Sequence, residues 1–251
     1  MLRFALLLVM SLALGSPGSF AQPPLRLMAN TSPPYADEKL PQRGLALELV
    51  EHIFATTDIT PKISIENWSR AVEGARLGVY DGLAAAWYSD ERAKDLLYSQ
   101  PYLRSELIIL KRRGDGNDYS ELADLSGGRL GVRVDYAYGV DFAAIPGLTL
   151  VPENHLIQNL LNMLNGRLDF VIGDQRTIIQ QLHEYLGDKV TQFEVTNIKL
   201  PPVARHVAVS RELKGHEKII ADFNAALEKV RKDGSHQAIV KKWDARYGGI
   251  E

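Results

Sequence analysis

Apolar and polar residues follow two periodicities along the chain, one typical of β-strands and the other of α-helices. Short apolar runs between turn residues predict strands, whereas apolar positions three or four residues apart predict helices. Leu45, Leu49 and Ile53, for example, fall on one face of a predicted helix. Predicted strands and helices alternate through most of the chain, which is typical of α/β layers with largely parallel strands.

The boundaries of these elements follow from the same pattern and from the glycine and proline residues that interrupt it. Strands are predicted over residues 25–29, 62–66, 82–86, 105–111, 129–134, 149–151, 170–173 and 204–210. Helices are predicted after Gly44 and over residues 68–77, 91–96, 119–125, 138–144, 155–164, 175–186, 217–232 and 235–247. Asn67 directly precedes the second helix and is a plausible N-cap for it.

The first 21 residues have the layout of a secretory signal peptide. Arg3 gives a positive start, residues 4–14 are apolar apart from one serine, and Ser19-Phe20-Ala21 supplies small residues before a cleavage point. The alternative is a membrane anchor or a buried helix, but the apolar run is too short to span a bilayer comfortably. We therefore expect residues 1–21 to be removed and the mature protein to be periplasmic.

Two polar breaks divide the remainder of the chain. Residues 112–117 (RRGDGN) are charged and rich in glycine, and a second break lies near residues 196–202. A chain that leaves one lobe and later returns to it forms two crossings, and clefts between such lobes commonly bind small ligands. We expect lobe 1 to contain residues 22–111 and 199–251, and lobe 2 to contain residues 112–198.

Composition and motif content favour binding over catalysis. The chain has 251 residues, of which 45% are hydrophobic and 24% charged, with a net charge of -2, so no basic field attracts nucleic acid. It contains no cysteine, which excludes disulfides, thiolate metal sites and a cysteine nucleophile. The sequence lacks nucleotide-binding and hydrolase motifs, and no histidine pair has the spacing of a helical metal site. We expect no metal, no cofactor and no catalytic residue.

One short pattern occurs twice, as Gly78-x-x-Asp81 and Gly166-x-x-Asp169, each time between a predicted helix and an apolar strand. One interpretation is two ordinary turns, in which glycine ends a helix and aspartate begins the next turn. The other interpretation is a pair of similar β/α lobes. The sequence alone leaves both interpretations open.

Several motifs occur in a fixed order from residue 25 to residue 247. They are SPPY at 32–35 with GLALEL at 44–49, WSRAVEGARLGVYDGL at 68–83, SDER at 89–92 with YSQPY at 98–102, DLSGGRLGV at 124–132, and LDFVIGD at 168–174. This series resembles the periplasmic solute-binding proteins of family 3, the polar amino-acid-binding group of ABC importers. The resemblance implies a type II periplasmic binding protein fold, with two α/β lobes and a ligand cleft between them.

The resemblance also implies which residues hold the charged ends of an amino acid. Arg92 matches the arginine that binds the carboxylate, and a guanidinium can grip a carboxylate with two parallel hydrogen bonds. Asp174 matches the aspartate that pairs with the ammonium group. The alternatives are an ion pair of Arg92 with Glu91 or Asp95, and a role for Asp174 as N-cap of the following helix.

Aromatic and loop residues complete the predicted ligand site. Tyr35 and Trp68 are expected to form walls, although packing of Trp68 in the core is an open alternative. Tyr136 can donate its hydroxyl or backbone amide. Ala86 and Tyr88 occupy positions where relatives often carry small hydroxyl residues. These departures leave the ligand class open, including whether it is a standard α-amino acid.

The expected function is that of a periplasmic substrate-binding protein of an ABC transporter. Its two lobes would close by a hinge on a small polar ligand, an amino acid, which stabilises the closed form by contacts to both lobes. The expected partners are this ligand and an inner-membrane ABC permease, with the protein itself a monomer. Two alternatives remain: an enzyme similar to cyclohexadienyl dehydratase, for which no general acid is placed, and a ligand-presenting sensor.

Overall fold

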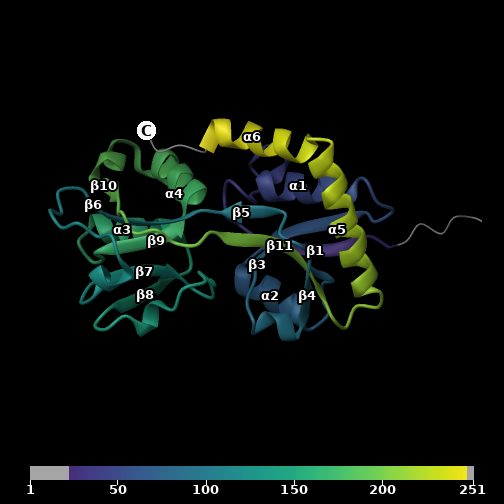
Figure 1. The fold of residues 1–251 in the computed structure, drawn as a ribbon, viewed down its shortest axis with the longest axis horizontal. Helices are drawn as coiled ribbons and strands as arrows, with labels where there is room; N and C mark the ends of the chain where they lie inside the picture. The colour runs from purple at the N-terminus through teal and green to yellow at the C-terminus, as the bar shows by residue number, and fades with distance from the viewer. Residues whose placement is uncertain (1–22, 248–251) are drawn as a thin grey trace, which may run out of the picture.

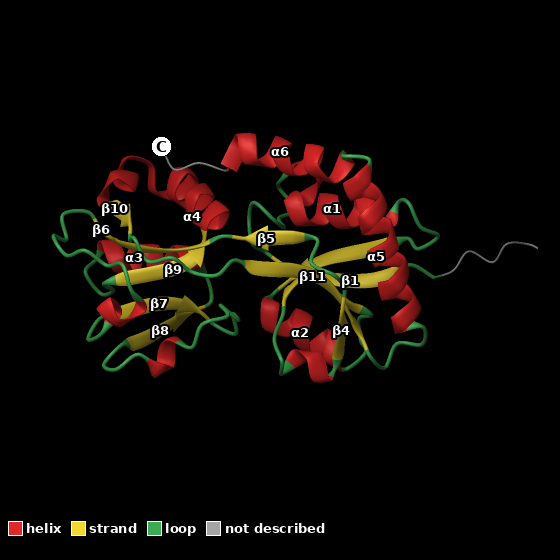
Figure 2. Cartoon of the chain, viewed as in Figure 1, coloured by secondary structure: helices red, strands yellow, loops and turns green. Residues whose placement is uncertain are grey.

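The computed structural model describes residues 23–247 and divides them between two lobes, each built on one β-sheet (Figures 1 and 2). The α/β architecture expected from the sequence is therefore confirmed. The predicted signal peptide lies outside the described residues. Among the helices of residues 23–247, none has the length and apolar character needed to cross a membrane.

The sheet of lobe 1 has strand order β2-β1-β3-β11-β4, and β5 pairs with the other end of β11. Strand β1 is parallel to both β2 and β3, whereas β11 runs antiparallel to its neighbours. Its strands are β1 (Leu25–Asn30), β2 (Pro61–Glu66), β3 (Gly82–Trp87), β4 (Leu96–Tyr98), β5 (Leu103–Ser105) and β11 (Val203–Ser210).

Helices cover both faces of this sheet (Figure 2). They are α1 (Leu45–Phe54), α2 (Trp68–Arg76), α5 (His216–Lys232) and α6 (Ser235–Tyr247). Side chains alternate along β1 because successive residues of a strand point to opposite faces. Leu27 packs in the core with α1, α5 and α6, whereas the next residue, Met28, packs with α2 on the other face.

The sheet of lobe 2 has strand order β10-β6-β9-β7-β8. Strand β7 is parallel to β8 and β9, and β6 runs antiparallel to β9 and β10. Its strands are β6 (Leu107–Arg112), β7 (Arg129–Arg133), β8 (Thr149–Glu153), β9 (Phe170–Asp174) and β10 (Phe193–Val195). Its helices are α3 (Leu156–Leu164) and α4 (Gln175–Gln181), the latter continued by a π-helical turn over Leu182–Leu186.

The chain crosses between the lobes twice. The first crossing is Glu106, between β5 and β6, and the second joins β10 to β11 through residues 196–202. The prediction that residues 107–111 belong to lobe 1 is wrong, because β6 is hydrogen-bonded to β9 and β10 of the second sheet. The predicted boundary between residues 198 and 199 falls inside the second crossing.

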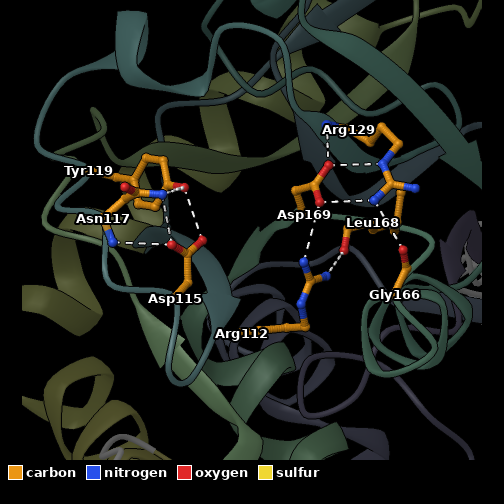
Figure 3. Close-up of polar contacts among 8 residues, drawn as sticks. All are labelled: Arg112, Asp115, Asn117, Tyr119, Arg129, Gly166, Leu168 and Asp169. Atoms are coloured by element: carbon orange, nitrogen blue, oxygen red, sulfur yellow. Dashed lines mark hydrogen bonds and ion pairs between the residues drawn. The ribbon is translucent and has the colours of Figure 1, made fainter.

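The polar segment 112–117 belongs to lobe 2, where Arg112 ends β6 and a loop follows, and it is not the connection between the lobes. Arg112 donates to Asp169 at 3.3 Å, and Asp115 accepts hydrogen bonds from the side chains of Asn117 and Tyr119 (Figure 3). Its charged and glycine residues therefore form a turn that is hydrogen-bonded to its own lobe. Composition alone does not distinguish such a turn from a linker between lobes.

Three predicted helices are wrong in extent. Residues 91–96 form a 3-10 turn (Arg92–Lys94), after which the chain enters β4 because this strand pairs with β11. The other two shrink to 3-10 turns over Leu122–Leu125 and Phe142–Ala144. Segments this short gain little from cooperative helix formation, so local capping and strand pairing decide their structure.

The repeated Gly-x-x-Asp motif makes the same clamp in both lobes. Asp81 accepts from the backbone N–H of Arg26 at 2.7 Å and from its guanidinium at 2.7 Å. Asp169 accepts in the same way from Arg129, at 3.0 and 2.9 Å (Figure 3). The Arg129 side chain is the main cause that lowers the pKa of Asp169 to about 2. Each aspartate thus ties a helix-ending turn to the start of a neighbouring strand.

Candidate ligand-binding cleft

A cleft runs between the lobes at the point where four strands end. The last residues of β1, β3, β7 and β9 all line it: Asn30, Trp87, Arg133 and Asp174. The carboxyl ends of strands are where open α/β sheets bind ligands, because side chains from several strands converge there. The fold therefore places polar and aromatic groups of both lobes around one space.

Arg92 projects into this cleft from the 3-10 turn after β3. Its Nη1 donates to the Trp87 carbonyl at 2.9 Å, and its Nη2 donates across the cleft to the Asp135 carbonyl at 2.8 Å. The guanidinium also lies 5.2 Å from the centre of the Trp68 ring. Within residues 23–247 no ion pair joins Arg92 to its two acidic neighbours, one of which pairs instead with an arginine of α2.

Asp174 lies at the opposite wall and is 5% exposed. Its Oδ1 accepts hydrogen bonds from the backbone N–H and the hydroxyl of Thr177, at 3.0 and 3.2 Å, so it caps α4. Its Oδ2 accepts from the Tyr35 hydroxyl of lobe 1 at 2.7 Å. Burial, and then the Asp174 carboxylate, raise the pKa of Tyr35 above its ordinary value, so this hydroxyl remains a donor at neutral pH.

Trp68 and Tyr136 face each other across the same cleft. Trp68 begins α2 and donates from Nε1 to the Asp135 carbonyl at 3.3 Å, while part of its ring packs against the core beneath α2. Tyr136 lies edge-on to Trp87 with ring centres 5.0 Å apart, and its hydroxyl accepts from Asn30 at 2.9 Å. Both residues therefore belong to the contact between the lobes.

Two predicted site residues, Ala86 and Tyr88, do not line the cleft. Ala86 is fully buried in the core beneath α2, whereas its neighbours Ala85 and Trp87 line the cleft because side chains alternate along a strand. Tyr88 is 49% exposed, donates to Asp90 at 2.9 Å and packs on Tyr98. These two assignments are corrected by the structure.

Arg205 is a cleft residue that the sequence analysis missed. It lies on β11, is 5% exposed, and donates from Nε to the Ser105 hydroxyl at 3.0 Å. Its guanidinium lies 3.6 Å from the centre of the Tyr35 ring and 5.4 Å from that of Trp87. A charged residue inside the apolar strand 203–210 was the signal that could have revealed it.

Arg133 is a second residue that was missed. It is the last residue of β7, and its guanidinium lies 4.3 Å from the centre of the Tyr136 ring. Its Nη2 donates to the Asn154 carbonyl at 3.1 Å, whereas its Nε is buried and forms no hydrogen bond. This arginine therefore keeps an unused donor at the cleft.

Aromatic side chains of both lobes pack against each other at the cleft. Trp87 contacts Tyr136 and Tyr138, with ring centres 5.0 and 5.9 Å apart, and Trp68 lies 6.2 Å from Tyr136. Two cavities lie beside Arg92: an inner one of about 10 Å³, which is no more than one water molecule needs, and an outer one of about 510 Å³ along Trp68, Asp135 and Tyr136. A ligand as large as an amino acid therefore reaches the inner space only when the lobes separate.

Comparison with known proteins places the chain among binding proteins. The family described as bacterial extracellular solute-binding proteins, family 3, matches residues 26–245. The chain is 25% identical over 209 residues to a putative ABC transporter arginine-binding protein 2 of Escherichia coli (strain K12), covering 80% of this chain and 81% of that protein. It is 23% identical over 227 residues to a probable histidine-binding protein of Campylobacter jejuni, covering 88% and 85%.

Solved structures share the two-lobe fold. An ancestral arginine-binding protein bound to arginine matches with a TM-score of 0.75 at 20% identity, over 89% of this chain and 99% of that chain. A histidine kinase sensor domain similar to periplasmic binding proteins matches with a TM-score of 0.72 at 22% identity, over 88% and 95%. The expected type II periplasmic binding protein fold is thereby confirmed.

Proposed function

Because the chain belongs to family 3 of the bacterial extracellular solute-binding proteins, we propose that it captures an amino acid between its lobes and presents it to a membrane ABC permease. The proposed location is the periplasm, in keeping with the extracellular character of the family and with the predicted signal peptide. The relatives named above are binding proteins for arginine and histidine, which supports an amino acid as the ligand class.

One observation carries this proposal: a guanidinium of lobe 1 and a carboxylate of lobe 2 line a single cleft. Arg92 offers its planar donors to a carboxylate, and Asp174 offers oxygen lone pairs to an ammonium group. A ligand held by both residues stabilises the closed form relative to the open form, because the open form separates them. Ligand binding is then coupled to closure by this differential contact.

The enzyme alternative has less support. The named relatives are binding proteins, and the sequence places no general acid, which such an enzyme requires. We therefore retain binding as the function.

Isothermal titration calorimetry against a panel of amino acids tests the proposal, with the Arg92→Ala variant beside the natural protein. Loss of charge-assisted hydrogen bonds worth about 1.5–3 kcal/mol should weaken binding roughly 10- to 150-fold. Arg70→Ala is the matched control, because Arg70 has a side chain 73% exposed and does not line the cleft. Binding that is unchanged in Arg92→Ala would remove the role given to this residue.

A further inference from the structure

The cleft carries more positive charge than a neutral zwitterion requires. Arg92, Arg133 and Arg205 all line it. In the part of the chain that the structure describes, none of the three forms an ion pair with a carboxylate. An α-amino acid needs one guanidinium for its carboxylate, so two guanidinium groups remain to be explained.

Arg205 is the most deeply placed of the three. It is 5% exposed, and the only hydrogen bond of its side chain within residues 23–247 runs from Nε to the neutral Ser105 hydroxyl. A buried cation without an anionic partner costs free energy, and the ring of Tyr35 at 3.6 Å offsets only part of that cost by a cation–π contact. The remaining donors of Arg205 therefore favour an anion supplied from outside the protein.

Arg133, in the other lobe, also lacks an anionic partner. Its hydrogen bonds go to the Tyr136 hydroxyl and the Asn154 carbonyl, which are both neutral, and its Nε is buried without a partner. Arg133 and Arg205 line one pocket together, so a single anionic group between them can accept from both.

The aspartates of the cleft do not neutralise these arginines. Asp174 already accepts from Thr177 and, across the lobes, from the Tyr35 hydroxyl. Asp135 is exposed, and its side chain contacts only the Ser69 hydroxyl, at 3.4 Å, among the hydrogen bonds of the described residues. Arg92 is met by the carbonyl oxygen of Asp135 and not by its carboxylate.

We propose that the ligand carries two anionic groups, so that it is a small dicarboxylate of the acidic amino acid type and not a neutral or cationic amino acid. One carboxylate binds Arg92, and the second binds between Arg133 and Arg205. This inference rests on the proposed function and assigns its ligand class. The ammonium group of an acidic amino acid would still face Asp174.

Calorimetry with pairs of ligands that differ in charge but hardly in size provides the test. L-glutamate is compared with L-glutamine, L-aspartate with L-asparagine, and L-arginine is added as a cationic amino acid. The acid of at least one pair should bind ten times more tightly than its amide. Glutarate and succinate lack the ammonium group, so they separate a site for dicarboxylic acids from a site for acidic amino acids. Tight binding of either class of ligand supports the inference.

Variants then assign the preference to its residues. Arg205→Met and Arg133→Gln should each reduce the preference for the acid at least fivefold, whereas Arg205→Lys should keep part of it. Arg70→Gln makes the same change in net charge outside the cleft and should leave the preference for the acid over its amide unchanged.

The outcomes separate the two proposals. Tighter binding of an amide or of arginine would overturn the dicarboxylate while leaving an amino-acid-binding protein. An acid preference that survives both Arg205→Met and Arg133→Gln would also overturn it. Binding of no ligand in the panel would overturn the proposed function, and the dicarboxylate with it.

Discussion

Replacing Tyr35 by phenylalanine removes a single oxygen atom that joins the two lobes. This hydroxyl donates to Asp174 at 2.7 Å, and Tyr35 has no exposed surface. The ring remains in place beneath the guanidinium of Arg205. The substitution therefore removes this bond, together with a longer one that the hydroxyl accepts from Arg176 of α4 at 3.4 Å, and preserves the packing around the ring.

The size of the effect follows from the charge of the acceptor. A hydrogen bond to an ionised group contributes about 1.5–3 kcal/mol, and breaking it leaves one Asp174 oxygen without its donor. The ratio of closed to open protein should fall roughly 10- to 150-fold, since each 1.36 kcal/mol corresponds to a factor of ten. Ligand affinity should fall by up to the same factor, because the ligand is held by the closed form.

Calorimetry measures the loss of affinity, and small-angle X-ray scattering measures the accompanying increase in radius of gyration. Tyr102→Phe is the matched control: Tyr102 is 1% exposed, and its hydroxyl donates to the Ala84 carbonyl within lobe 1. It should lower stability without changing closure. If both variants bind ligand equally well, the hydroxyl of Tyr35 does not hold the lobes together.

Three further changes probe separate parts of the structure. Asp169→Asn should lower the free energy of unfolding by up to about 2 kcal/mol at pH 7, because the pKa of Asp169 is lowered from 3.8 to about 2 in the folded protein. This contribution is present above pH 4 and is lost as the pH falls through 2, so a stability deficit of the variant that stays constant down to pH 2 in thermal unfolding would contradict it. Gly82→Ala places a Cβ 2.2 Å from the Ala208 carbonyl oxygen of the adjacent strand and should destabilise by about 3 kcal/mol in urea unfolding, whereas Gly116→Ala, with open space around it, should be neutral. Asp244→Asn breaks the pair of α6 with Arg176 of α4 at 2.7 Å, worth roughly 1 kcal/mol or less, so scattering should show a shift toward the open form of at most about fivefold. Arg176→Gln also removes the hydrogen bonds of Arg176 to the Tyr35 hydroxyl and the Arg104 carbonyl, so it should open the protein further; equal shifts in the two variants would show that these bonds do not hold the lobes together.

Much of the architecture is accessible from the sequence because hydrophobic periodicity reports which face of an element is buried. The apolar positions of α1 are fully buried as predicted, and Asn67 accepts a hydrogen bond from the backbone of Ser69, as its predicted role as N-cap requires. The first crossing was misplaced because an apolar run at residues 105–111 does not show which of two sheets it will join. That information lies in long-range pairing with β9 and β10.

The cleft was predictable only in part. The family resemblance led to Arg92, Asp174, Trp68 and Tyr136, which line the cleft, and to Tyr35, which does not form a wall of it but is fully buried and reaches Asp174 through its hydroxyl. Ala86 was wrong by one position, because a shift of one residue along a strand turns a side chain to the other face. Arg133 and Arg205 were missed because each lies in a strand: a charge within an apolar strand marks Arg205 as unusual, but the sequence pattern does not show that either residue faces the opposite lobe.

The two crossings differ in length, and this difference decides how the cleft opens. Strand β5 passes into β6 through Glu106 alone, whereas the second crossing contains the seven residues 196–202, so we expect Glu106 to act as the pivot. Leu107, next to the pivot, lies on β6; β9 with Asp174 is one strand spacing from β6, about 5 Å, and β7 with Arg133 is two, about 10 Å. Displacement in a rotation grows with radius. Arg133 should therefore move about twice as far as Asp174 when the cleft opens, so a departing solute loses its contact with Arg133 before its contact with Asp174.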